Sequence, residues 1–401
     1  MLTSFATLKP RNFFSTAIAV AAAALLGACG SGHSHHYPPP PPPDPAPGVI
    51  YDVVPLIDDP AALIRVTSTG INEYDMVAGI IFKPSGPSRA FLHNGARLID
   101  LGDFGGASAQ AFGINRCGHV AGWALGPSRD IPQAFRYDGA LHRLAPPGPF
   151  SQARAVSDCD KVTGIATFGG AAHAYQYDGV LHDLGTLGGA RSEGLDINVS
   201  GMVAGTSEVA GTLHAFLYDS ASGPALHDLG TLGGARSYAR ALNDAGQVVG
   251  GSDNLDGKLH AYRYDGGAMH DLGTLGGDFS EAVEINAAGL VVGSSSPTGI
   301  GSTHGFMHDG ALMHDIGTLG GNYSEAVAIN ADGVVVGSSN LPGAGGERAV
   351  SWTLAGALVD LNDHLYAADP GLRLTHALAI NNKGSIVAVS NHGLVLLKVR
   401  H

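Results

Sequence analysis

The chain repeats one short motif along almost its whole length. The segment LHDLGTLGG at 181–189 returns at 226–234, and MHDLGTLGG at 269–277 and MHDIGTLGG at 313–321 are close copies. A chain of this kind folds as an array of one small unit, because each copy buries its apolar face against the next. Residues that return in every copy are therefore expected to build the unit. Function is expected where the copies differ.

A second motif gives the spacing of the units. Segments such as MVAG, QVVG and VVVG, and SIVA in the last copy, end in chain order at Gly79, Gly122, Gly164, Gly205, Gly250, Gly293, Gly337 and Ala388. These eight units of about 43 residues fall in the range of four-stranded propeller blades. The last interval is the longest because it contains the additional segment 362–374.

Each unit contains four strand-like segments. In the copy at 280–317, SEAVEIN leads through a turn from Asn286 to Gly289 into LVVGSSS, and Asp309-Gly310 joins HGFMHD to ALMHDIG. Asn at the first and Gly at the fourth position suit a type I turn, and Asp-Gly is a second hairpin signal. GTLGG is the remaining connection, so we assign it to the crossing between blades. The four segments are named strands a to d, from the axis of the ring outwards.

The two ends of the repeat region complement each other. The segment VIYDVVPL (49–56) matches strand d, and GLVLLKVR (393–400) matches strand c of a last unit that lacks its own outer strand. Joining both ends in one blade closes a ring and removes a sheet edge that would invite aggregation. The sequence therefore predicts an all-β, eight-bladed β-propeller over 49–401, closed by the N-terminal strand. An open β-solenoid, which needs polar caps at both ends, is the alternative.

The composition agrees with many short strands and tight turns. Charged residues make up 14% of the chain and aromatic residues 7%, whereas glycine alone numbers 59. This leaves few of the Glu, Lys and Gln residues that fill helix surfaces. The formal net charge of −13 makes nucleic acid an unfavourable partner and suits cationic partners or simple solubility.

The N-terminus has the features of an export signal. Lys9 and Arg11 precede the apolar segment 15–28, which is too short to span a bilayer. It ends at LGAC (26–29), which resembles the lipobox of bacterial lipoproteins. In that family the peptide is cut before the cysteine, so the resemblance implies a signal peptide at 1–28 and lipidation of Cys29. An ordinary secretory signal with a chance cysteine is the alternative.

The residues after the cysteine predict a location and a tether. Gly30 suits passage to the outer membrane in lipoproteins of this kind, on the periplasmic or the cell-surface side. The segment 29–48 is rich in His and Pro and cannot bury a core, so we expect an extended, solvated spacer. His33, His35 and His36 could capture a metal ion, but nothing in the sequence fixes their geometry.

Several units carry the motif of a known family. HAYQYDG (173–179), HAFLYD (214–219) and HAYRYDG (260–266), with the DLGTLGG segments, resemble the HAF repeats of bacterial extracellular proteins. The resemblance covers nearly all of 90–361 and is weakest in the first and last units, where RAV (348–350) replaces His-Ala-Phe. It implies export and a repetitive β fold. It implies no catalytic residue.

Two cysteines remain besides the lipobox cysteine. Cys117 and Cys159 occupy the same position, in the turn between strands a and b, in successive units. Near the axis, equivalent Cα atoms can approach within the roughly 6 Å that a disulfide needs, and exported proteins meet oxidants. We therefore predict a stabilising disulfide between them, with two buried free thiols as the alternative.

Most of the 19 histidines are periodic, which favours structure over chemistry. One set opens strand c and another precedes an aspartate on strand d, so each blade is expected to contain a local His/Asp hydrogen bond. The positions are His173, His214, His260 and His304 on strand c, and His182, His227, His270 and His314 on strand d. The chain contains no HExxH, paired CxxC or Gly-x-Ser-x-Gly motif. We therefore predict no catalytic residue, metal site or cofactor.

The loops between strands b and c differ most between units and are expected to share one face with the crossings. Variable loops on a rigid ring often carry binding specificity, although solubility and drift also explain such variation. The basic residues at this face are candidates for weak binding. They are Arg89, Arg129, Arg191, Arg236, Lys258 and Arg348.

These features predict a lipid-anchored, monomeric, non-catalytic binding or scaffold module for a protein or glycan partner at the bacterial cell envelope. The alternative is an envelope glycan hydrolase or lyase on the same scaffold, which needs convergent, unrepeated carboxylates. Candidates without an evident pairing in the sequence are Asp103, Asp130, Asp253 and Glu347. Metal handling by the His-rich tether is a third hypothesis.

Overall fold

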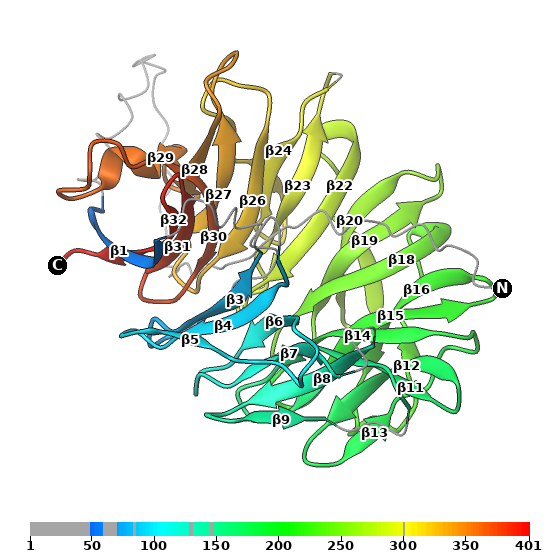
Figure 1. The fold of residues 1–401 in the computed structure, drawn as a ribbon. Coiled ribbons are helices and arrows are strands. Elements are labelled where there is room, and N and C mark those ends of the chain that lie inside the picture. Colours follow the sequence, from blue (N-terminus) through cyan, green and yellow to red (C-terminus); the bar gives the residue numbers. More distant parts are fainter. Residues whose placement is uncertain (1–48, 59–69, 83–85, 128–130, 145–147, 300) are drawn as a thin grey trace, which may run out of the picture.

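The protein is a ring of eight four-stranded antiparallel sheets. The computed structural model describes residues 49–58, 70–82, 86–127, 131–144, 148–299 and 301–401. The sheets within these ranges follow one another in chain order (Figure 1), and the first strands of all neighbouring blades are in contact, including those of the first and last. This confirms the predicted all-β, eight-bladed propeller.

The blades are numbered in chain order, and the strands of each are given from the axis outwards. Blades 1 and 2 contain β2 (Gly70–Ile71), β3 (Val77–Ile81), β4 (Arg89–His93) and β5 (Leu98–Asp100), then β6 (Ala109–Ile114), β7 (Val120–Leu125), β8 (Pro132–Tyr137) and β9 (Leu141–Arg143). Blades 3 and 4 contain β10 (Ser151–Val156), β11 (Val162–Phe168), β12 (Ala171–Tyr177) and β13 (Leu181–Asp183), then β14 (Ser192–Ile197), β15 (Val203–Val209), β16 (Thr212–Tyr218) and β17 (His227–Asp228). Blades 5 and 6 contain β18 (Gly233–Leu242), β19 (Val248–Asn254), β20 (Leu259–Asp265) and β21 (Ala268–Asp271), then β22 (Gly276–Ile285), β23 (Val291–Pro297), β24 (His304–His308) and β25 (Met313–Asp315). Blades 7 and 8 contain β26 (Ser324–Ile329), β27 (Val335–Asn340), β28 (Glu347–Trp352) and β29 (Val359–Asp360), then β30 (Leu374–Ile380), β31 (Ile386–Ser390), β32 (Gly393–Val399) and β1 (Tyr51–Asp58).

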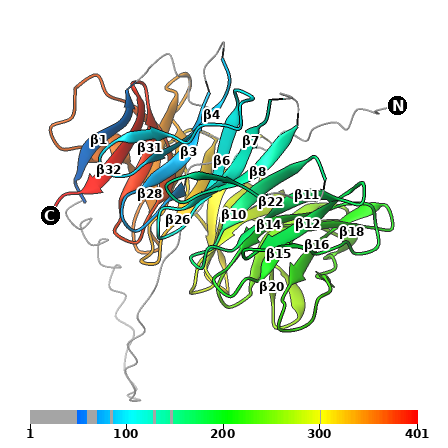
Figure 2. The ribbon, with the colours of Figure 1, turned by 60° about the horizontal axis from the view of Figure 1, so that its bottom comes forward.

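The two ends of the chain meet in blade 8. The N-terminal strand β1 pairs antiparallel with β32, from Tyr51 opposite Val399 to Asp58 opposite Gly393. Figures 1 and 2 show this blue strand beside the red C-terminal one. Tyr51 and Leu56 are buried, so β1 belongs to the core of the blade. The predicted closure is confirmed.

A ring of buried asparagines links the turns between the first and second strands. Asn72 accepts hydrogen bonds from Tyr74 N and Met76 N, and its Nδ2 donates to the carbonyl oxygen of Asn115 in the next blade, at 3.1 Å. Asn381 in blade 8 donates to the carbonyl oxygen of Asn72 at 3.0 Å, which completes the circle. The same donation to the next blade is made by Asn115, Asn198, Asn243 and Asn330. The repeated asparagine therefore shapes its own turn and also fastens neighbouring blades.

Blade 3 departs from this pattern and compensates. Ser157 stands where the other units have asparagine, and its hydroxyl accepts a hydrogen bond from Lys161 N within its own turn. The bond to blade 4 comes instead from Lys161, whose Nζ donates to the carbonyl oxygen of Ser200 at 2.8 Å. A link between blades is thus kept although the residue that makes it has changed.

The glycine of the second strand makes room for an aromatic ring of the third. A Cβ atom added at Gly205 would lie 2.6 Å from Cζ of Phe216, whose side chain is fully buried. Gly122 has the same relation to Phe135, at 2.8 Å. Close approach of this kind requires glycine, which explains why the motif that ends in glycine repeats at a constant spacing.

Helix is almost absent from the described ranges. The 3-10 helix η1 (Leu361–His364) precedes the additional segment of blade 8. None of the described residues forms a helix long and apolar enough to cross a membrane. The predicted signal peptide at 1–28 and the predicted tether at 29–48 lie outside these residues.

Candidate functional site

The histidines that open the third strand make the predicted hydrogen bonds with aspartates in four blades. His173 Nδ1 lies 2.9 Å from Asp183 Oδ1, and the same oxygen accepts from Gly185 N at 2.8 Å. The aspartate therefore joins the third strand to the start of the crossing. Equivalent pairs in the next three blades are His214 with Asp228, His260 with Asp271 and His304 with Asp315.

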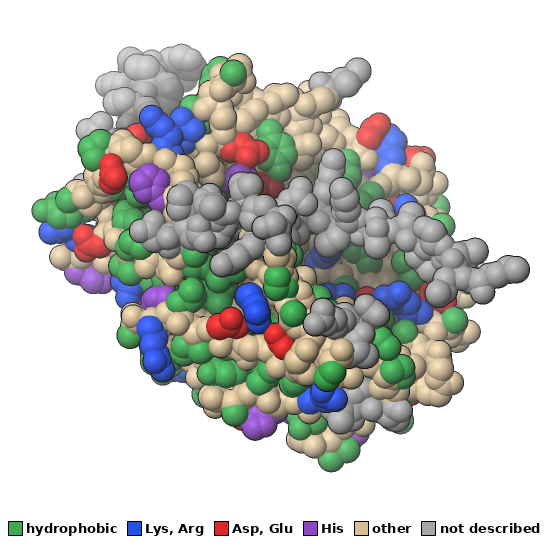
Figure 3. Space-filling model, in the orientation of Figure 1, with side chains coloured by type: hydrophobic (Ala, Val, Ile, Leu, Met, Phe, Trp, Pro, Cys, Tyr) green, Lys and Arg blue, Asp and Glu red, His purple; other side chains and the backbone are tan. Residues whose placement is uncertain are grey.

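The predicted basic residues lie at the crossing end of the blades, but each described one faces a carboxylate. Lys258 Nζ, in the loop between β19 and β20, lies 2.6 Å from Asp278 in the next crossing, so loops and crossings share one face. The other pairs are Arg89 with Asp103 (2.9 Å), Arg191 with Glu193 (3.2 Å), Arg236 with Asp253 (2.9 Å) and Arg348 with Asp360 (3.7 Å). Arg129 lies outside the described residues. In Figure 3, blue and red side chains are interspersed over the face shown, which carries no single basic patch. Their binding role stays a prediction.

The candidate catalytic carboxylates are not brought together. Asp103 and Asp253 belong to the ion pairs of blades 1 and 5, and Glu347 in blade 7 lies 2.9 Å from Nε2 of His376. Asp130 lies outside the described residues. No group of three or more His, Cys, Asp and Glu side chains able to hold a metal ion occurs in the ranges that the structure describes. These positions therefore give no support to the hydrolase or lyase hypothesis.

The predicted disulfide is not formed in the structure. Cys117 and Cys159 are free. Both are exposed, so the alternative prediction of buried free thiols is wrong as well. Their turns are neighbours, since Arg116 N donates to Asp158 Oδ1 at 2.7 Å. However, a whole asparagine side chain spans the gap between the turns, from Asn115 to the carbonyl oxygen of Ser157 at 3.0 Å. The two turns are therefore joined by hydrogen bonds and not by a disulfide.

Charged side chains on the innermost strands form a set that the sequence analysis missed. Arg154 Nε lies 2.7 Å from Glu193 Oε1, and Arg240 Nη2 lies 2.6 Å from Glu281 Oε1, each pair joining neighbouring blades. The Arg240 side chain is 37% exposed, although its surroundings are protein on most sides. Burial disfavours its charged form, and the Glu281 carboxylate outweighs this effect and raises the pKa of Arg240. Water therefore reaches the inner side of the ring.

Two further acids lie on the same strands without a basic partner. Burial raises the pKa of Asp196 on β14. Burial also raises the pKa of Glu284 on β22 well above its usual range, and the charge of Asp196 adds to the shift. The signal in the sequence was the variation between SEGLDIN, SYARALN and SEAVEIN, which all form first strands. It was overlooked because the search for variable positions was confined to loops.

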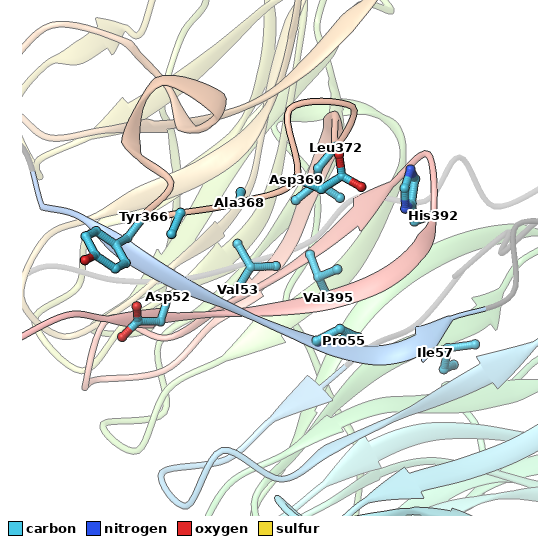
Figure 4. Close-up of a pocket in the computed structure, with 11 residues that line it drawn as sticks. Asp52, Val53, Pro55, Ile57, Tyr366, Ala368, Asp369, Leu372, His392 and Val395 are labelled. Atoms are coloured by element: carbon cyan, nitrogen blue, oxygen red, sulfur yellow. The ribbon is translucent and has the colours of Figure 1, made fainter.

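A groove of about 400 Å³ lies on blade 8 (Figure 4). Two parts of the chain that break the repeat form it. One is β1, eight residues long where the other described outer strands have two to four, and the other is the segment 366–372 after η1. They are tied together by a hydrogen bond from Tyr366 N to the carbonyl oxygen of Tyr51, at 2.8 Å.

The lining of the groove is apolar between two polar ends. Its middle consists of Val53, Pro55, Ile57, Ala368, Leu372 and Val395. At one end Arg400 lies over the half-exposed Tyr366 ring and pairs with Asp52 at 3.0 Å. Asp369 and His392 lie at the other end (Figure 4), and no ion pair joins Asp369 to another of the described residues. The groove thus combines an apolar floor with an uncompensated negative charge.

The sequence matches no family model and no curated protein. Among solved structures, it is similar to the β-propeller domain of the Trilobed protease from Pyrococcus furiosus, with 13% identity over 80% of this chain and 100% of that chain and a TM-score of 0.48. It is also similar to a puromycin-hydrolyzing peptidase from Mycobacterium tuberculosis (13% identity, 85% of this chain, 61% of that chain, TM-score 0.49). A third is TolB from Acinetobacter baumannii (13% identity, 80% of this chain, 79% of that chain, TM-score 0.38). At these values neither activity nor partner transfers to this chain, and the propeller assignment rests on its own strand order.

Proposed function

We propose that the protein is a monomeric, lipid-anchored, non-catalytic binding module of the bacterial cell envelope, and that the groove of blade 8 holds a segment of a partner protein. The observation that carries the proposal is the origin of the groove. The polar groups that repeat around the ring are engaged in hydrogen bonds that hold the blades, whereas the groove is formed by an outer strand longer than its counterparts and by a segment that the other units lack. Binding sites on repeat scaffolds are usually found where such added segments lie.

The lining favours a protein segment over a glycan. A sugar needs several convergent hydrogen-bonding groups, but the middle of the groove offers the aliphatic side chains of Val53, Ile57 and Leu372. These suit an apolar side chain of a partner, in the way that an anchor residue fills a pocket at a protein interface. The charge of Asp369 at one end favours Lys or Arg next to that apolar residue.

The position of the groove agrees with an anchored protein. Its wall begins at Asp52 in β1, shortly after the segment 29–48 that we propose as a tether from a lipidated Cys29. Several acyl chains on this cysteine provide stable anchoring, since each buried methylene contributes about 0.8 kcal/mol. Labelling cells with radioactive palmitate tests this part: the wild-type chain incorporates label in the outer-membrane fraction, and the Cys29→Ser variant does not.

Site-specific photo-crosslinking in the native host tests the groove. A photoreactive amino acid at Ala368, which lines the groove, is expected to crosslink to one partner protein. The same amino acid at Leu255, which is 85% exposed on a loop of blade 5, serves as the control for random encounters. The crosslink at position 368 should disappear when Asp369→Lys is added. The binding groove would be refuted if positions 368 and 255 gave the same crosslinked proteins. It would also be refuted if the crosslink at position 368 were unchanged by Asp369→Lys.

A further inference from the structure

One position on the innermost strands carries an acidic side chain in two blades and a small residue in the other described blades that have the same bulge. It follows the bulge at which the register of the first and second strands shifts. In the other described units with this bulge, the residue is small: Gly113, Ala155, Ala241, Ala328 and Ala379. Blade 4 has Asp196 and blade 6 has Glu284. Both departures therefore introduce a carboxyl group at the same level of the ring.

The two carboxyl groups come from the strands on either side of β18. Asp196 reaches from β14 towards β18, where Leu242 N donates to its Oδ2 at 2.9 Å. Its other oxygen accepts from Ile197 N at 2.8 Å. Glu284 comes from β22, on the opposite side of β18, and the charge of Asp196 acts on it. Only the small side chain of Ala241 occupies the equivalent position on the strand between them.

Glu284 has a buried carboxyl oxygen that no described group satisfies. Its Oε2 is buried and accepts no hydrogen bond from any described group. A buried carboxyl oxygen without a partner is costly, so such groups are normally protonated, paired or bound to a metal ion. The nearby arginines are already engaged, Arg154 by Glu193 and Arg240 by Glu281. The positive charge that would compensate Asp196 and Glu284 is therefore not supplied by those side chains.

We propose that Asp196 and Glu284 bind one hard divalent cation, Ca²⁺ or Mg²⁺, on the inner side of the ring. The available ligand atoms are carboxylate oxygens, without sulfur or imidazole, which is the donor chemistry of these two ions. Two carboxylates suffice for Mg²⁺ with water as the remaining ligands, and Ca²⁺ tolerates mixed shells of carboxylate, carbonyl and water oxygens. The cation joins blades 4 and 6 across blade 5 and so connects three consecutive blades.

Calorimetric titration of the chelator-treated mature chain with CaCl2 and with MgCl2 tests the site. With two carboxylates we expect a dissociation constant of about 1 mM for the preferred ion, at the weak end of extracellular calcium modules. At 10 mM this ion should raise Tm by about 2 °C in a ring of this size. The two titrations also decide which ion is bound.

The variants Asp196→Asn and Glu284→Gln keep the shape of the side chains. Each should abolish both the saturable heat of cation binding and the rise in Tm. Asp332→Asn, which removes an exposed carboxyl from a turn of blade 7, is the matched control and should retain both. Absence of saturable binding in the wild type, or the same binding in all variants, would overturn the proposal. The groove variant Asp369→Lys should bind the ion normally, so failure of the cation site and failure of the groove are distinguishable.

Discussion

Asn381 is the residue whose loss tests ring closure most directly. Its Nδ2 donates to the carbonyl oxygen of Asn72 at 3.0 Å and to Asp75 Oδ1 at 2.9 Å, across the seam between blades 8 and 1. Its Oδ1 accepts from Lys383 N and Ser385 N within its own turn. The variant Asn381→Ala removes four hydrogen bonds, each worth about 1 kcal/mol net, and leaves a buried carbonyl oxygen with fewer donors. We expect a loss of about 4 kcal/mol in the free energy of unfolding.

In a ring of about 350 residues the entropy of unfolding is roughly 0.7 kcal/mol/K, so Tm should fall by about 5 °C. Thermal unfolding followed by circular dichroism measures this fall. Asn243→Ala is the matched control, since Asn243 makes the same kinds of bond between blades 5 and 6, away from the seam. Both variants should lose similar stability. Only Asn381→Ala should accelerate amide exchange in β1 and β32. If its Tm lies within 1 °C of the wild type, or if exchange at the seam is unchanged, the reasoning on closure is wrong.

Three more outcomes follow from the packing and the charges. Gly205→Ala places a Cβ against Glu193 O and 2.6 Å from Phe216 Cζ, so urea unfolding should show a loss of about 3 kcal/mol, and a neutral effect would contradict the steric argument. Deleting 49–58 uncovers the apolar strand β32, so gel filtration should show aggregates, and a stable monomer would argue against the role of β1. Burial raises the pKa of Glu325, and the charge of Glu347 adds to this rise, despite the hydrogen bonds from Tyr323 and Ser338 and the charge of His376. The stability that this group contributes is present below the ordinary carboxyl pKa and is lost as pH rises through the raised one. Glu325→Gln should therefore gain stability relative to the wild type between pH 4 and pH 8, and a constant difference between the two proteins would exclude this titration.

The fold could be predicted because it depends on local chemistry that repeats. A turn with Asn at its first and Gly at its fourth position has few conformations, and Gly118 and Gly289 indeed adopt the positive φ that this turn requires. Repetition at a constant interval then leaves little choice of architecture. Closure was also predictable, because the segment 49–56 has the pattern of the strand that the last unit lacks.

The sites could not be predicted in the same way, because they depend on distances between units. Glu193 and Glu281 look like ordinary strand residues until the ring places Arg154 and Arg240 beside them. The cysteines illustrate the opposite error. Their equivalent positions in neighbouring turns were correct, but these turns are joined by hydrogen bonds of Asn115 and Arg116 and the two thiols are free.

The location of the groove follows from how a ring of repeats must close. Every interior blade is constrained on both sides, because its outer strand continues into the crossing that begins the next blade. In blade 8 the third and outer strands are not joined by a turn, because β32 and β1 come from opposite ends of the chain. The segment 366–372 and the long β1 therefore meet where the ring is closed by pairing between these two ends. A binding site at this seam lies next to the residues that lead to the proposed anchor. Transplanting 361–373 into the crossing between blades 5 and 6 provides the contrast: the interior blade should lose stability, whereas shortening the segment in blade 8 should abolish the groove and leave Tm unchanged.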